Sequence, residues 1–312
     1  MAQLIEKIKD FFTAPPCPSL VFQFSSSYIS AIQVEVKEKK VKRHAILPLP
    51  AGLIEPHFDR RNLPEAAALA GLMKEGLGGL HFSGEKAACL IPESCFKIFI
   101  LPFETFPPSG REREKLLLWR IKKHLPVLPE DARLSFEEIA SGASLKVFLS
   151  LARIAVIQEY EELCTGLGLD VGILTAPTLS LLNLVDQAQE KDLILANIEE
   201  DSISLAAVTP SDIMLYRVKP FIIERRGRIP TGQRVETVIK EIENTVHFIE
   251  DREKRKIQSL WLHSSLTDHQ EVLFSELAAR LPFPIKLIDS PCLGEIPPSE
   301  KAFLVPLAGQ IP

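Results

Sequence analysis

The sequence predicts an α/β protein built from two halves that share one order of elements. Each half is expected to open with three consecutive strands, at 20–47 in the first half and at 193–218 in the second. Each half then continues with amphipathic helices and short apolar strands. A chain of 312 residues is long enough for two such units. The repeated order indicates an internal duplication, although residue identities do not repeat.

Composition excludes several classes of function. The net charge of −5 gives no basic footprint for nucleic acid. No apolar run reaches the ~18 residues of a membrane-spanning helix, and the N-terminus lacks the apolar centre of a secretory signal. The five cysteines are scattered without a CxxC pair, and the histidines lack ligand spacing, so we expect a reducing, cytoplasmic location and no metal site.

Residues 1–19 are expected to form an N-terminal amphipathic helix followed by a Pro-rich linker. Leu4, Ile5, Ile8 and Phe11 have helical spacing, and prolines at 15, 16 and 18 end the pattern. Such a helix can dock on a membrane surface, on a partner or on its own domain. Its charges are balanced by acidic residues, which favours docking on protein.

The first half is assigned to residues 20–168, with an inserted small subdomain at about 86–152. Strands are predicted at 20–24, 28–36 and 41–47, and a helix is expected to follow Asn62 as its cap, with Leu69, Met73 and Leu77 on its buried stripe. In the insert, strands are predicted at 87–91, 96–101, 133–139 and 146–152. Ser109 and Glu112 have capping-box spacing at the start of a helix, and a last helix at 156–167 ends at Gly168.

The second half is assigned to residues 169–312. Strands are predicted at 170–174, 193–198, 202–208, 213–218, 259–263 and 285–289, with helices at 177–188, from Val235 to about 252, and at 270–281. Residues 219–234 are expected to be an exposed loop, with Arg225, Arg226 and Arg228 facing solvent because buried unpaired charge is costly. That loop is too short to hold a further subdomain.

Residues 20–309 resemble the PilM family, actin-like cytoplasmic proteins of type IV pilus assembly. The most specific stretch is FKIFILPFETFPPSGREREKLLLWRIKKHLPVLPEDARLSFEEI, with a strand ending in Leu101-Pro102 and a helix carrying Trp119. The order of elements in VFLSLARIAVIQEYEELCTGLGLDVGILTAPTLSLLNL also matches. The resemblance implies an actin-like (ribonuclease H-like) fold of two duplicated halves. The short 219–234 segment implies that the fourth lobe is reduced or missing.

The family's phosphate loops are altered here. Where the resemblance places Asp-x-Gly-Ser, the chain has Gln23, Ser25 and Ser26; at the second loop it has Asn197 and Glu199; at the third it has Ser264 and Ser265. Gln23 cannot supply a carboxylate near magnesium, and a carboxylate about 4 Å from a phosphate costs about 4 kcal/mol at an effective dielectric of ~20. We therefore expect no cofactor and no catalytic residues. The alternative is a divergent ATPase that binds ATP and Mg through serine hydroxyls.

The family resemblance implies a scaffold that binds the cytoplasmic tail of a single-pass inner-membrane pilus assembly protein, with peripheral membrane association through that partner. The groove is expected between the first strands and the insert. Candidate partner-binding residues are Phe103, Phe106, Arg111, Arg113, Leu116 and Trp119, although core packing is the preferred interpretation of Trp119. A third possibility is a polymerising, cell-division-type actin homologue, which the short 219–234 segment argues against.

Overall fold

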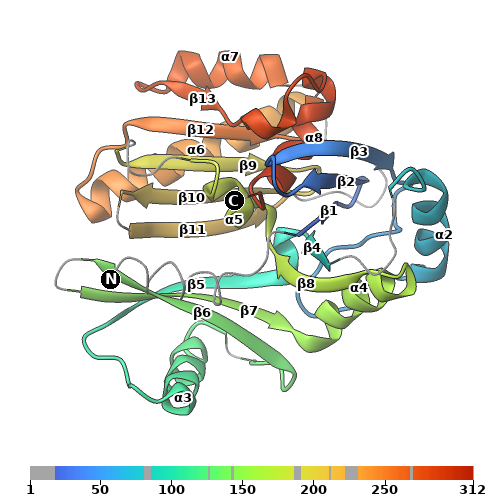
Figure 1. The fold of residues 1–312 in the computed structure, drawn as a ribbon. Coiled ribbons are helices and arrows are strands. Elements are labelled where there is room, and N and C mark those ends of the chain that lie inside the picture. The colour runs from blue at the N-terminus through green and yellow to red at the C-terminus, as the bar shows by residue number, and fades with distance from the viewer. Residues whose placement is uncertain are drawn as a thin grey trace, which may run out of the picture.

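The structure is a computed structural model that describes residues 18–80, 86–125, 127–141, 144–185, 191–210, 212–221, 231–267 and 270–311. The predicted N-terminal helix at 1–12 lies outside these ranges. Five strands form a first sheet in the order β3-β2-β1-β4-β8 (Figure 1). They are β1 (Leu20–Phe24), β2 (Tyr28–Glu35), β3 (Lys40–Pro48), β4 (Lys86–Leu90) and β8 (Asp170–Thr175). The first three strands pair antiparallel, and β1, β4 and β8 pair parallel.

A second sheet repeats this arrangement in the order β11-β10-β9-β12-β13. Its antiparallel strands are β9 (Leu193–Ile198), β10 (Ser202–Thr209) and β11 (Asp212–Pro220), and its parallel strands are β9, β12 (Ser259–Ser264) and β13 (Ile285–Leu287). Strand order and strand sense therefore agree between the two halves. The duplication predicted from element order is confirmed.

The two predicted domain boundaries do not follow the sheets. β8 pairs with β4 in the first sheet, with Ala87 opposite Val171, so the predicted start of the second half at 169 falls one strand too early. β4 is also a strand of the first sheet, so the insert begins at β5 and not at residue 86. The reason is physical: a short buried strand has the same apolar pattern whichever neighbour it pairs with.

The insert is a three-stranded sheet in the order β5-β7-β6 with one helix on it. Its elements are β5 (Phe96–Phe103), α3 (Gly110–Ile121), β6 (Ala132–Ser141) and β7 (Ser144–Arg153). Along β7, Val147, Leu149 and Leu151 are buried in a core shared with α3, while Phe148 and Ser150 face the other way. One face of the inserted sheet is therefore covered by α3, and the other faces the body of the protein.

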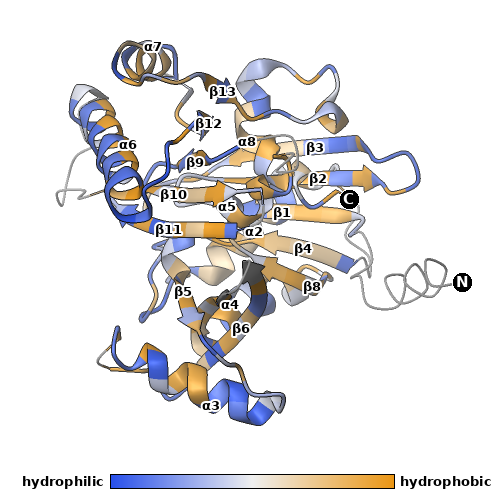
Figure 2. Ribbon diagram, turned by 90° about the vertical axis from the view of Figure 1, so that its left-hand side faces the viewer, coloured by the Kyte–Doolittle hydropathy of each residue, from blue (hydrophilic) through white to orange (hydrophobic). Residues whose placement is uncertain are grey.

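Helices divide the remaining core into three layers. α2 (Ala66–Gly76) and α4 (Ile154–Gly166) pack on one face of the first sheet, and α6 (Thr231–Glu253) and α7 (Gln270–Arg280) pack on one face of the second. α5 (Pro177–Leu182) and α8 (Pro298–Ala308) share a core with both sheets. Alternate residues of each central strand enter different layers, so Phe22 packs with α2 and α4 whereas Val21 packs with α5 and α8. In Figure 2, β1 and β4 are drawn largely in the colour of hydrophobic residues.

The connection between β11 and α6 is short, as predicted, but its ends differ from the prediction. β11 continues to Pro220 and α6 begins at Thr231, which leaves only residues 221–230 between them and no room for a fourth lobe. Arg234 lies in α6 and is buried, not exposed, because its guanidinium donates two hydrogen bonds to Glu200, at 3.1 and 2.9 Å. Arg225, Arg226 and Arg228 lie outside the described residues.

Two local predictions at helix starts need correction. Asn62 does not cap α2, which begins at Ala66; its side chain holds the preceding loop by accepting the His57 N–H at 2.6 Å and donating to the His57 and Arg60 carbonyls. Ser109 occupies the N-cap position of α3, but its side chain makes no capping hydrogen bond.

α8 was not predicted, because Pro306 lies within it and proline normally ends a helix. Its residues also lack a polar face, so they show no amphipathic stripe. Across the described ranges, no helix has the length and apolar character needed to cross a membrane.

Candidate functional site

The three altered loops meet where β1, β9 and β12 end. Glu199 directly follows β9 and Ser265 directly follows β12, and these two strands are parallel neighbours. Gln23 lies on β1 of the other half, and its amide donates a hydrogen bond to Glu199 Oε1 at 2.9 Å. Gln23 and Glu199, which the family resemblance assigns to two different phosphate loops, are therefore in direct contact although they lie 176 positions apart in the chain.

The Glu199 carboxylate fills this junction. It accepts hydrogen bonds from Gln23 Nε2 at 2.9 Å, from the Tyr28 hydroxyl at 3.0 Å and from the Ser265 hydroxyl at 2.8 Å. We call Gln23, Tyr28, Glu199 and Ser265 the Glu199 cluster. Tyr28 was not predicted as a member of this cluster, because the sequence does not indicate which group the hydroxyl of a tyrosine at the start of a strand will contact.

Burial controls the charge of the cluster. Glu199 is only 5% exposed. Burial, with the negative charge of Asp201, raises the pKa of Glu199 to about 7, although hydrogen bonds from Ser265, Tyr28 and Gln23 act in the opposite direction. Burial also raises the pKa of Tyr28, and the neighbouring Glu199 adds to this effect. The carboxyl group therefore changes charge near neutral pH.

At each of the two turns, after β1 and after β9, one backbone N–H donates the hydrogen bond that closes the hairpin. The Ser25 N–H donates to the Tyr28 carbonyl at 2.9 Å, and the Glu199 N–H donates to the Ser202 carbonyl at 2.9 Å. These N–H groups are not free to bind a phosphate. Ser25 is buried and Ser26 is half-buried.

Asn197 and Ser264, the other altered loop positions, are directed into the core. Asn197 contacts Thr178 Oγ1 at 3.1 Å and His263 Nδ1 at 2.7 Å, and His263 Nε2 lies 2.9 Å from the Ala302 carbonyl oxygen. Burial lowers the pKa of His263 to about 4, so the imidazole is neutral at pH 7 and its single N–H can donate to the Ala302 carbonyl or to Asn197 Oδ1, but not to both. Ser264 Oγ accepts the Leu266 N–H at 3.2 Å.

A second buried carboxylate also joins the two halves and was not predicted. Glu93, between β4 and β5, is 2% exposed and accepts the Thr178 N–H at 2.7 Å and the Tyr216 hydroxyl at 2.6 Å. Burial raises its pKa above the ordinary value. Among the described residues, no group of three or more His, Cys, Asp or Glu side chains is placed to hold a metal.

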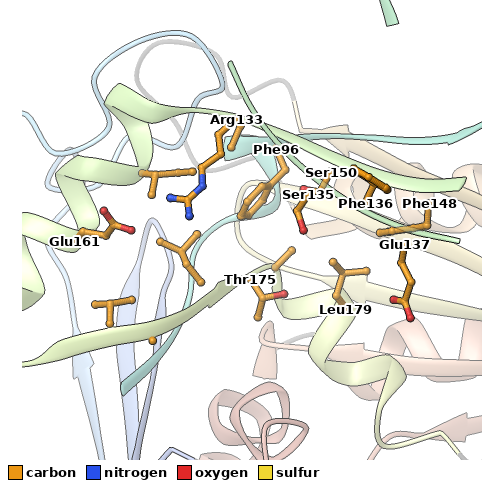
Figure 3. A pocket seen from close by; sticks show the side chains of 16 residues that line it. Phe96, Arg133, Ser135, Phe136, Glu137, Phe148, Ser150, Glu161, Thr175 and Leu179 are labelled. Atoms are coloured by element: carbon orange, nitrogen blue, oxygen red, sulfur yellow. The ribbon is translucent and has the colours of Figure 1, made fainter. Parts of the chain in front are cut away.

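A groove lies between the free face of the inserted sheet and the first half. Its volume is about 510 Å³, and Phe96, Phe148, Arg133, Glu161 and Gly172 are among the residues that line it. Arg133 on β6 and Glu161 on α4 extend into the space from opposite walls (Figure 3). Within the described part of the chain neither makes an ion pair. The groove therefore combines an apolar surface with two charges available to a ligand.

The predicted partner-binding residues lie on the opposite face of the inserted sheet. Phe103 is buried in the core under α3, and Phe106 and Leu116 pack against that core. Arg113 is held by an ion pair with Glu138 at 2.7 Å. Arg111 is exposed.

Trp119 is the one apolar residue among these candidates whose side chain is exposed. It is 55% exposed, so the interpretation of Trp119 as a core residue is wrong. Of the six candidates, Arg111 and Trp119 are the two whose side chains are exposed at the surface.

Two sheets of identical order, joined by α5 and α8 and carrying an inserted sheet, define the actin-like ATPase fold. The chain is similar to one in the PilM–PilN type IV pilus biogenesis complex, with 18% identity over 96% of this chain and 100% of that one, at a TM-score of 0.73. A Bacteroides thetaiotaomicron protein with actin-like ATPase fold and unknown function matches at 12% identity over 90% and 95%, with a TM-score of 0.53.

The ethanolamine utilization protein EutJ from Carboxydothermus hydrogenoformans matches at 11% identity over 99% of this chain and 96% of that one, with a TM-score of 0.50. No protein-family model and no curated protein sequence matches the chain. The actin-like fold predicted from the resemblance to PilM is confirmed.

Proposed function

We propose that the protein is a non-enzymatic adaptor that holds an extended segment of a partner protein in the groove beside the inserted sheet. The observation that carries this proposal is the groove itself. Its volume of about 510 Å³ lies in the range of binding pockets, and the charged groups of Arg133 and Glu161 extend into it beside aromatic side chains.

The geometry of the groove favours an extended ligand. β8 is the edge strand of the first sheet, and its residues Val171, Gly172, Leu174 and Thr175 line the groove. A peptide that adds to this edge would gain backbone hydrogen bonds, and alternate side chains would reach the inserted sheet. Charged groups on the peptide would pair with Arg133 and Glu161.

The fold comparison supports one class of partner. The similarity to a chain of the PilM–PilN complex supports the cytoplasmic tail of a single-pass inner-membrane protein as the ligand, in a type IV pilus or type II secretion-like assembly. The protein would then lie on the cytoplasmic side of the inner membrane, attached through its partner.

The test is binding of the full chain to tail peptides of single-pass membrane proteins encoded by neighbouring genes, measured by fluorescence anisotropy. Gly172→Trp should weaken binding about tenfold or more, because a Cβ at Gly172 meets nothing within 4 Å and an indole there would fill the groove. Trp119→Ala, on the opposite face of the inserted sheet, is the control and should leave the affinity unchanged. Loss of binding in Trp119→Ala but not in Gly172→Trp would move the site to α3 and contradict the proposal.

We also propose that the adaptor works without nucleotide. The Glu199 cluster supports this, because its carboxylate occupies the junction of the three loops and would repel phosphate. Calorimetry with ATP and magnesium should detect no binding, and the melting temperature should not shift. A dissociation constant below about 10 μM, or some −7 kcal/mol, would favour the divergent ATPase instead.

A further inference from the structure

The inserted sheet presents α3 at one extremity of the molecule, at the end opposite α7 (Figures 1 and 2). One side of α3 is fixed, because Leu117 and Ile121 are fully buried against the sheet. The other side carries Trp119, which is 55% exposed, and the chain beyond the helix exposes Val127 at 82%. These are the two most exposed large apolar side chains among the described residues.

Positive charge surrounds this tryptophan. Residues 115–127 contain Lys115, Arg120, Lys122 and Lys123 and no acidic residue, although the whole chain has a net charge of −5. Lys115, Trp119, Lys122 and Lys123 have the spacing of one helical face, and the three lysines are exposed. Lys123 Nζ lies 4.3 Å from the centre of the Trp119 ring.

These lysines are not neutralised by the rest of the protein. In the parts of the chain that the structure describes, none of Lys115, Lys122 and Lys123 forms an ion pair. The acidic residues of α3, Glu112 and Glu114, lie near its N-terminus, where Arg113 pairs with Glu138 at 2.7 Å. The charge of α3 is thus segregated toward its C-terminal half.

We propose that this α3 tip (Lys115, Trp119, Lys122 and Lys123) binds the surface of an anionic phospholipid membrane. Indole rings favour the headgroup region of a bilayer, and lysines near an anionic surface each contribute about 1 kcal/mol, or about fivefold in affinity. A protein partner would be expected to meet a continuous apolar patch, whereas here a single exposed indole shares a helical face with three exposed lysines. The contact is shallow, because the apolar side of α3 is already buried. This inference does not depend on the proposed function.

The experiment is co-sedimentation of the full chain with phosphatidylglycerol vesicles and with phosphatidylcholine vesicles at about 100 mM salt. We expect binding to the anionic vesicles alone. The double variant Lys122→Glu with Lys123→Glu should lose about thirtyfold or more in affinity, and Trp119→Ala about fivefold. The matched control is Lys37→Glu with Lys74→Glu, which makes the same charge change on the β2–β3 turn and on α2, and should change affinity by less than about twofold.

A second measurement reports on Trp119 directly. The chain has two tryptophans, so Trp261→Phe leaves Trp119 as the sole indole. Its emission should shift to the blue with phosphatidylglycerol vesicles and not with phosphatidylcholine. Absence of binding to anionic vesicles, or equal losses in the α3 variant and the control, would overturn the proposal. A concentration-dependent dimer that only the α3 variant abolishes, without vesicle binding, would assign the tip to a second copy and also overturn it.

Discussion

Replacing Glu199 with glutamine is expected to remove a large loss of stability that the protein undergoes as the pH rises to neutral. Burial raises the pKa of Glu199 from an ordinary 4.5 to about 7. Between these values the folded protein retains a proton that the unfolded chain has released, so the free energy of unfolding falls as the pH rises. The expected loss is on the order of 3 kcal/mol, complete above the folded-state pKa.

Glutamine keeps the size of the side chain and its hydrogen-bonding role. Its carbonyl oxygen can accept from Tyr28 or Ser265, and its amide can donate toward Gln23 Oε1, a buried atom with no partner among the described residues. The variant should therefore gain on wild type by on the order of 3 kcal/mol between about pH 5 and pH 8. Urea unfolding of both proteins across this range measures the difference.

The comparison with wild type is needed because His263 makes the free energy of unfolding rise with pH, whereas Glu199 makes it fall. Burial lowers the pKa of His263 to about 4 from an ordinary 6.5, so the unfolded chain binds more protons and stability rises with pH across that interval. This contribution is present in both proteins and cancels in the difference. A difference that does not change with pH would show that Glu199 keeps an ordinary pKa and that the cluster is open to water.

The positions of the central strands along the chain were predictable because these strands are almost continuously apolar. Strands at 20–24 and 193–198 were predicted with their observed bounds, since every residue of β1 and β9 is buried. Edge strands were placed within one to two residues. The pairing of β8 could not be predicted, because partner choice depends on the crossover through the insert and not on the strand's own residues.

Gln23, Glu199 and Ser265 were singled out because the resemblance to the PilM family places them at three loops that meet in the fold. In the structure Glu199 contacts both Gln23 and Ser265. Tyr28 and Glu93 were missed, because a lone tyrosine or glutamate has many possible neighbours and only the closed fold selects one.

The groove was expected between the strands at 20–47 and the insert, whereas the observed groove lies between the inserted sheet and β8 with α4, so its lining residues differ from the predicted ones. Phe103 and Leu116 were chosen for their apolar character, without regard to which face of the inserted sheet they occupy. On β7 the alternation places Phe148 in the groove and Leu149 under α3. The period-two alternation along β7 therefore separates the residues of the two faces, whereas on β6 Phe136 lines the groove and also packs against the core under α3.

Gly309→Ala is expected to destabilise the protein by about 3 kcal/mol or more, at the upper end of overpacking costs. A Cβ at Gly309 would overlap the Ser180 carbonyl oxygen and lie 2.6 Å from its carbonyl carbon. Neither segment can easily move away, because the Ser180 hydroxyl donates to the Pro306 carbonyl at 2.6 Å and Asn183 Nδ2 donates to the Gly309 carbonyl at 2.9 Å. The obstacle is main chain, which cannot change rotamer.

The consequence would extend beyond this contact, because α5 and α8 share the core that joins the two sheets. Urea unfolding measures the cost, with Gly71→Ala as the matched control. Gly71 lies inside α2 with nothing within 4 Å of its Cβ position, so alanine there should be neutral or stabilise the protein by up to about 1 kcal/mol. If both variants unfold at the wild-type midpoint, α5 and the segment after α8 are not in backbone contact, and the two sheets must be joined in another way.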